Sequence, residues 1–209
     1  MLSSRALLRS PSKVSIFGFL TIILIGTVLL MLPAASTFGR LTFVDALFTA
    51  VSASCVTGLV VVDTGKALSS FGQLVVLALI QIGGLGIMTL STLFLLLGGR
   101  RPSLAGRMLI QDAFTHSGER SVSDIIRDVV QFTLVIEGMG ALLFFLRFYP
   151  GRTVSEAAYV AVFHAISAFC NAGFSLFSDS LVAYREDWVL NLTACLLIVS
   201  GGIGFLVLF

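Results

Sequence analysis

An internal repeat constrains this chain more than any other feature. Residues 48–59 recur as residues 163–174, shifted by 115 positions, and six of the 12 aligned pairs are identical. Both copies keep the pattern Ser-Ala-x-Cys-x-x-Gly, and each lies between two long apolar segments. Each copy is too short to cross a bilayer as a helix, which favours a re-entrant pore loop in which a half-helix enters the membrane and extended backbone returns. Two surface helices with loop glycines are the alternative.

Composition places this repeat in a membrane. Hydrophobic residues make up 57% of the chain and charged residues 11%, with a mean hydropathy of +1.04. A soluble domain carries roughly a quarter charged residues. We therefore expect an integral membrane protein. The three cysteines show no C-x-x-C spacing, so neither disulfides nor a zinc site are expected.

Four apolar segments predict full transmembrane helices, at residues 14–32, 71–97, 129–148 and 188–209. The first follows three basic residues and ends in small residues, as a signal peptide would. Its 19 residues exceed the ~7–15 of a signal-peptide core and match the ~20 of a span. We interpret it as a retained helix with a cytoplasmic N-terminus.

The short apolar runs between these spans predict half-helices. Asp45 opens the first one, where a carboxylate suits the positive end of the helix dipole. The second begins near Ser155. The predicted organisation is a first unit at residues 1–97, a cytoplasmic linker at 98–128 and a second unit at 129–209 that is truncated at its inner end. The linker carries five arginines and is either a docking surface for a soluble partner or a determinant of topology and lipid contact.

The fold class that follows is an all-α integral membrane protein, built from parallel repeats of transmembrane helix, re-entrant half-helix with loop, and transmembrane helix. Eight of the 13 Lys and Arg residues fall in segments predicted to be cytoplasmic, which agrees with the positive-inside rule. Both units then have the same orientation, unlike the inverted repeats of many secondary transporters. A second glycine motif repeats at an offset of 118 in the closing spans and predicts a hinge or close helix packing: Gly83, Gly84 and Gly86 in the first, Gly201, Gly202 and Gly204 in the second.

The two loops suit a monovalent cation. Backbone carbonyls can replace the water shell of such an ion. Gly58 and Gly173 reach positive φ without a Cβ penalty, so consecutive carbonyls can turn to one side. The half-helix C-termini also favour a cation. The loops contain neither arginine nor carboxylate, which disfavours anion passage and a divalent-selective acidic ring.

Residues 48–59, the following Val-Val-Asp-Thr-Gly at 61–65 and the Ile-Gln-Ile-Gly-Gly-Leu-Gly at 80–86 resemble the membrane subunits of Trk/Ktr-type bacterial potassium uptake systems. Residues 163–174 resemble their second pore loop, and the resemblance covers residues 14–209. It implies four such units around one pore, of which this chain resembles the first two. It also implies a homodimer in the bacterial inner membrane, seated on a cytosolic ring that binds nucleotides and gates potassium uptake.

The resemblance assigns site residues by position. The expected ion-binding filter residues are Val56, Thr57, Gly58, Asn171, Ala172 and Gly173. The expected filter-supporting residues are Cys55, Leu59, Cys170 and Phe174. Potassium is the only metal expected, no covalent cofactor or nucleic acid is expected, and the nucleotide belongs to the partner subunit.

Two other functions are weighed against potassium conduction. A coupled secondary solute carrier can also use re-entrant loops, but inverted repeats are not seen. A membrane enzyme needs paired carboxylates or a Ser/His/Asp set at membrane depth, and only Glu137 and His164 come near, so we expect no enzyme. Glu137 is the one acid deep in a span, with either a structural partner or a place along an ion path.

Overall fold

The computed structural model describes residues 11–97 and 122–203, and this part of the chain is helical with connecting loops. Its one extended pairing is an isolated bridge between Ser36 and Leu68. The helices are α2 (Pro11–Leu30), α3 (Phe43–Ser54), α4 (Ser70–Leu97), α6 (Val122–Phe148), α7 (Val154–Phe169) and α8 (Trp188–Ile203), with the short 3-10 turns η1 (Pro33–Ala35) and η2 (Val182–Tyr184).

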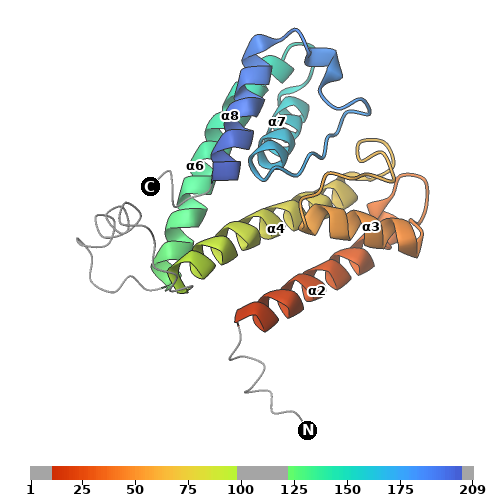
Figure 1. Ribbon diagram of the computed structural model, residues 1–209. Coiled ribbons are helices and arrows are strands. Elements are labelled where there is room, and N and C mark those ends of the chain that lie inside the picture. Colours follow the sequence, from red (N-terminus) through yellow and green to blue (C-terminus); the bar gives the residue numbers. More distant parts are fainter. Residues whose placement is uncertain (1–10, 98–121, 204–209) are drawn as a thin grey trace.

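The helices gather into two groups, α2–α3–α4 and α6–α7–α8, which we call the first and second helix groups (Figure 1). In each group the short middle helix packs against both long ones, and α4 also contacts α6 and α7. Helix α4 therefore belongs to the first group and forms the wall against the second. The all-helical prediction is confirmed for the described residues.

The helix bounds follow the predicted segments closely. The first helix ends at Leu30 and a proline-led turn follows, because proline cannot continue a helix. Helix α6 begins at Val122, so residues 122–128 at the end of the predicted linker are helical and continue into the predicted span. Residues 98–121 of the linker, the N-terminal basic residues to position 10, and Gly204 lie outside the described residues.

Each short helix begins with the same cap. The side-chain oxygen of Thr42 accepts the backbone N–H of Asp45, and that of Thr153 accepts the N–H of Glu156. In both, the acid three residues after the threonine lies in the first turn, where its charge suits the helix dipole. Helix α7 has 16 residues against 12 in α3, which is about one extra turn.

By length and composition, the stretch Arg127–Phe148 can cross a membrane; among the described residues, Ile16–Leu30, Ser70–Gly86 and Trp188–Ile203 are shorter apolar helices. Large apolar side chains nevertheless cover the outside, for example Val28, Leu134 and Leu142 at 60–61% exposure. Polar side chains such as Thr49 and Ser167 are buried. This distribution fits a protein surrounded by lipid tails, because many large apolar side chains face outward while polar ones are buried.

Helix α4 packs through two faces. On the face toward its own group, a Cβ at Gly72 would overlap the carbonyl oxygen of Ala35, and one at Gly83 would overlap that of Ser54. These glycines are 11 residues apart, close to three helical turns, so they share a face. Each lets another backbone approach where any side chain would block it.

The second face of α4 meets the second helix group. Gln73 accepts a hydrogen bond from the Tyr159 hydroxyl at 2.9 Å. A Cβ at Gly84 would lie 2.6 Å from Sγ of Cys170. Gln73 and Gly84 are again 11 residues apart. Each residue of the second pair directly follows one of the first pair in the sequence, so the two faces lie side by side around α4. Helix α4 therefore contacts both short helices at once.

Candidate functional site

The chain reverses after each short helix through the same backbone conformation. We call residues 55–59 the first return loop and residues 170–174 the second. In the first, Val56 has φ 48° and Gly58 has φ 74°; in the second, Asn171 has φ 59° and Gly173 has φ 70°. The left-handed conformation is easy for glycine and tolerable for asparagine, but costly for β-branched valine. The predicted positive φ at both glycines is observed.

A serine ties each return loop to its helix. Ser52 Oγ donates to the Leu59 carbonyl at 2.7 Å, and Ser167 Oγ donates to the Phe174 carbonyl at 2.6 Å. The two bonds are equivalent in the repeat. Sequence reasoning did not assign these serines to the site, although both belong to the identical pairs of the repeat. The signal in the sequence was a serine conserved between the two copies, seven residues before the last residue of each return loop.

The two return loops meet at their glycines. A Cβ on Gly58 would lie 2.8 Å from the carbonyl oxygen of Ala172 and 3.4 Å from Cα of Gly173. A Cβ on Gly173 would lie 3.4 Å from Cα of Gly58. The predicted site residues of the two copies, 115 positions apart, are therefore brought into backbone contact. Only residues without a side chain permit this approach.

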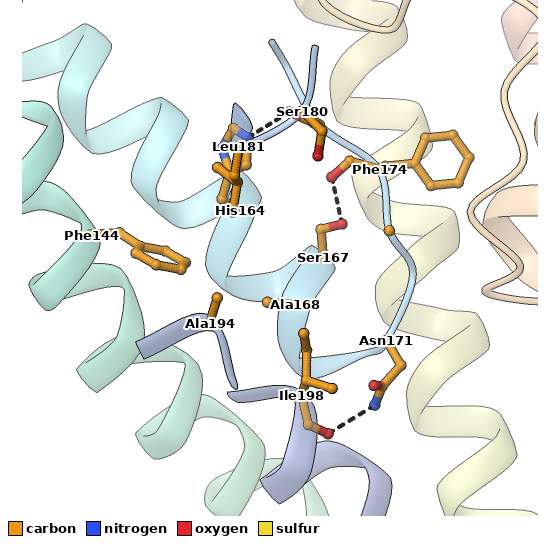
Figure 2. A pocket seen from close by; sticks show the side chains of 12 residues that line it. Phe144, His164, Ser167, Ala168, Asn171, Phe174, Ser180, Leu181, Ala194 and Ile198 are labelled. Atoms are coloured by element: carbon orange, nitrogen blue, oxygen red, sulfur yellow. Dashed lines mark hydrogen bonds between the residues drawn. The ribbon is translucent and has the colours of Figure 1, made fainter. Parts of the chain in front are cut away.

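The loops differ in what anchors them. Asn171 Nδ2 donates to the Ile198 carbonyl at 3.2 Å, which fastens the second loop to α8 (Figure 2). The side chain of the equivalent Val56 has no polar atom and packs partly buried against the core. In the first loop, the hydroxyls of Thr57 and Ser52 are hydrogen-bonded to each other at 2.9 Å. The second loop cannot form this bond, because Ala172 stands in place of the threonine.

The repeated glycines of the long helices serve close packing. A Cβ at Gly201 of α8 would overlap the Phe169 carbonyl, as one at Gly83 would overlap that of Ser54. Gly86 is looser, with Phe19 at 3.5 Å, and Gly202 meets only the Asn171 side chain at 3.8 Å. Helix α4 continues through Gly83, Gly84 and Gly86, and α8 continues through Gly201 and Gly202 to Ile203. Gly83 and Gly201 therefore allow close packing of another backbone against each helix, and neither helix is interrupted there as it would be at a hinge.

The supporting residues are not equally enclosed. Cys55 and Cys170 cap the ends of α3 and α7 at equivalent positions, but Cys170 is buried and Cys55 is exposed. Phe174 is 2% exposed and Leu59 is 60% exposed. Of the two cysteines, only Cys170 packs behind its loop in the described part of the chain. The second loop lies against α4, whereas in the described part of the chain no helix takes the matching place beside the first loop.

A cavity of about 240 Å³ lies behind the second loop, lined by Phe144, Ser167, Gly173 and Ile198 among others (Figure 2). Buried His164 borders it. One ring nitrogen of His164 is hydrogen-bonded to the Val160 carbonyl at 2.8 Å and the other to Ser175 Oγ at 2.9 Å. Both ring nitrogens are therefore occupied by structural partners.

A second cavity, of about 300 Å³, lies between the segments that follow the two loops. Asp63 is on its wall. A hydrogen bond from Ser178 lowers the pKa of Asp63, with the N–H groups of Lys66 and Gly65 adding to the effect against partial burial. Both N–H groups lie 2.9 Å from Asp63 Oδ1. Asp63 thus joins the segments after the first and second loops and stays negatively charged beside the cavity.

Glu137 finds its partner within the described residues. Gln81 Nε2 donates to both carboxylate oxygens, at 3.1 and 3.3 Å. Of the two roles expected for Glu137, the geometry supplies the structural one, with a side chain of α4 as the partner.

Comparison with known proteins gives consistent matches. The family model TrkH, described as a cation transport protein, matches residues 8–209. The chain is 46% identical over 200 residues to the Ktr system potassium uptake protein B of Bacillus subtilis, covering 96% of this chain and 45% of that protein. It is 40% identical to the Ktr system potassium uptake protein B of Vibrio alginolyticus, covering 94% of this chain and 43% of that protein. With the potassium/sodium uptake protein NtpJ of Enterococcus hirae, identity is 38%, covering 95% and 44%.

The chain therefore spans a little under half the length of the curated relatives it matches. These relatives are uptake proteins by name and not enzymes, as expected for this chain.

Proposed function

This chain belongs to the TrkH family of cation transport proteins, and we propose that it supplies the first half of a pore for potassium uptake. The filter is formed by backbone carbonyls of the two return loops. The ion-binding residues of the proposal are Val56, Thr57, Gly58, Asn171, Ala172 and Gly173. The observation that carries the proposal is the contact of two loops with matched backbone conformation at Gly58 and Gly173.

The chemistry of the loops supports a dehydrated cation. Positive φ at the first and third filter positions of each loop turns successive carbonyls toward one side, as an ion-binding backbone requires. The C-terminal ends of α3 and α7 lie immediately before the loops, and their partial negative charge favours a cation. Exposed carbonyls at this depth are tolerated only where they line a water-filled path.

The proposed architecture is a set of parallel repeats, with units at residues 1–97 and 129–209 joined by the linker. Matched caps, matched loop conformations and the matched packing of Gly83 and Gly201 support it. Helix α4 uses its second face to hold the second unit. The equivalent face of α8 includes Val199, at 53% exposure, and Gly202. In the proposed architecture a further repeat packs on this exposed face, as the second unit packs on α4.

The proposed assembly is a homodimer in the bacterial inner membrane, with the N-terminus in the cytoplasm and a cytosolic nucleotide-binding ring as partner. The nucleotide binds that ring and not this chain. Support comes from the names of the relatives, which are components of Ktr systems. The linker at residues 98–128, which carries five arginines, is proposed as part of the docking surface for that partner.

The filter is tested by Gly58→Ala and Gly173→Ala in the complete protein, expressed in a host deficient in potassium transport. Each added methyl group meets backbone of the other loop, and each position has positive φ. We expect the ratio of potassium to sodium uptake to fall by about tenfold, since an L-residue in this conformation costs on the order of 1–2 kcal/mol.

Gly138→Ala is the matched control, because a Cβ at Gly138 has no atom within 4 Å; its selectivity should equal that of the parent. Unchanged selectivity in both loop variants would refute the filter. Tight coupling of uptake to a second solute with no ion selectivity would favour the coupled carrier instead.

A further inference from the structure

Glu137 is the only carboxylate buried among the described residues, with 5% of its surface exposed. It lies on α6, and its partner Gln81 lies on α4. Burying an ionisable side chain among apolar helices is costly unless it is hydrogen-bonded. The amide of Gln81 offsets that cost by donating to both carboxylate oxygens. This pair joins the first helix group to the second.

The pair lies directly beneath the second return loop. Cys170 Sγ is 4.0 Å from Glu137 Oε1, and Cys170 is the cap residue immediately before the filter residues 171–173. On α4, one turn beyond Gln81, Gly84 lies against the same sulfur atom. The end of α7 is therefore enclosed by Glu137 on one side and by α4 on the other.

The same turn of α4 also holds the first loop. Gly83 lies against the carbonyl of Ser54, the last residue of α3, while its neighbour Gly84 lies against Cys170. The ends of both short helices thus rest on adjacent residues of one helix. Anything that fixes this turn against α6 fixes the spacing at which Gly58 meets Gly173.

We propose that Glu137 and Gln81 form a polar clamp that positions the second return loop against the first. Glu137 acts through Cys170 and the end of α7 as a positioning residue, and it does not contact the ion. The clamp depends on hydrogen-bond acceptors at position 137, not on the negative charge itself. Its effect on ion selection rests on the proposed function, whereas its effect on the enclosure of Cys170 does not.

The test uses full-length protein in cells, with Cys170 as the remaining cysteine, and N-ethylmaleimide as the probe. Glu137→Met and Gln81→Met keep side-chain length but remove the clamp. Losing the two buried hydrogen bonds between Gln81 and Glu137 should speed modification of Cys170 roughly tenfold or more, and the ratio of potassium to sodium uptake should fall several-fold.

Three further variants separate the clamp from a general packing effect. Glu137→Gln retains a carbonyl oxygen that accepts from Gln81, and its side-chain NH2 can donate to Gln81 Oε1, which is buried without a partner. Modification and selectivity should stay near those of the parent. The exchange Gln81→Glu with Glu137→Gln should do the same. Val135→Met places methionine on an exposed position of α6, at 60% exposure, and should change neither readout.

The clamp is refuted if Cys170 in Glu137→Met reacts at the parental rate, or if Glu137→Gln loses protection. Should Glu137→Met not reach the membrane, Gln81→Met removes the same hydrogen bonds and replaces it: the clamp requires that Cys170 react faster in that variant than in the parent. If the glycine variants leave selectivity intact while Glu137→Met speeds modification, the filter assignment fails and the clamp stands. If the glycine variants alter selectivity and the clamp variants alter neither readout, the clamp alone fails.

Discussion

At the residue scale, single polar contacts hold the ends of the helices. Asp187 precedes α8, accepts the N–H of Leu190 at 3.1 Å and pairs with Arg147 of α6 at 2.6 Å. Burial opposes its ionisation, but the Leu190 N–H and the Arg147 guanidinium prevail and lower the pKa of Asp187. Because the folded pKa lies below the unfolded value, this stabilisation is complete at neutral pH and is lost as pH falls through the folded pKa.

We expect Asp187→Asn to lower the free energy of unfolding by about 0.5–1 kcal/mol at pH 7, because Arg147 is about half exposed and the pair is screened. The difference should shrink as the pH falls below the unfolded pKa and through the lower folded pKa of this carboxyl. Thermal unfolding in detergent across pH measures both. The control is Glu186→Gln, at an 87% exposed side chain, which should show no such difference; equal stability of Asp187→Asn and parent at pH 7 would contradict the prediction.

At the element scale, α4 is the helix on which the short helices are assembled. Gly83 leaves no room for a methyl group beside the Ser54 carbonyl, and Gly201 of α8 leaves none beside that of Phe169. Overpacking of this kind costs about 1–3 kcal/mol, and here the obstacle is backbone, which cannot rotate away. We therefore expect Gly83→Ala and Gly201→Ala to lower the unfolding temperature measured in detergent.

Gly86→Ala is the matched control on α4. A Cβ there would lie 3.5 Å from Phe19, an ordinary contact, and alanine favours the helix over glycine by about 1 kcal/mol. That variant should be as stable as the parent or more so. A Gly83→Ala protein with parental stability would mean that α3 is not seated on α4 as described.

At the scale of the whole molecule, the proposed orientation places both return loops on the outer side and the linker inside. Ser117→Cys lies in the linker, outside the described residues, and Ala183→Cys lies at an exposed position of η2. With the native cysteines replaced, a membrane-impermeant thiol reagent should label Cys at 183 in intact cells. It should label Cys at 117 only after permeabilisation, because basic segments stay in the cytoplasm. External labelling at 117 would invert the topology.

The sequence by itself determined the elements and their local geometry. The repeat located both short helices, the loop glycines predicted left-handed backbone, and Asp45 marked the start of the first short helix. These features depend on residues a few positions apart, so local sterics and hydrogen bonding decide them.

Only the tertiary structure decided which distant residues meet. Gly58 contacts Gly173, Glu137 pairs with Gln81, and Cys170 is enclosed. Its sequence equivalent Cys55 is not, because burial depends on whether a neighbouring helix lies alongside. Equivalent residues in a repeat share their backbone conformation, but their side-chain surroundings come from packing between units, and here α4 supplies that packing to the second loop.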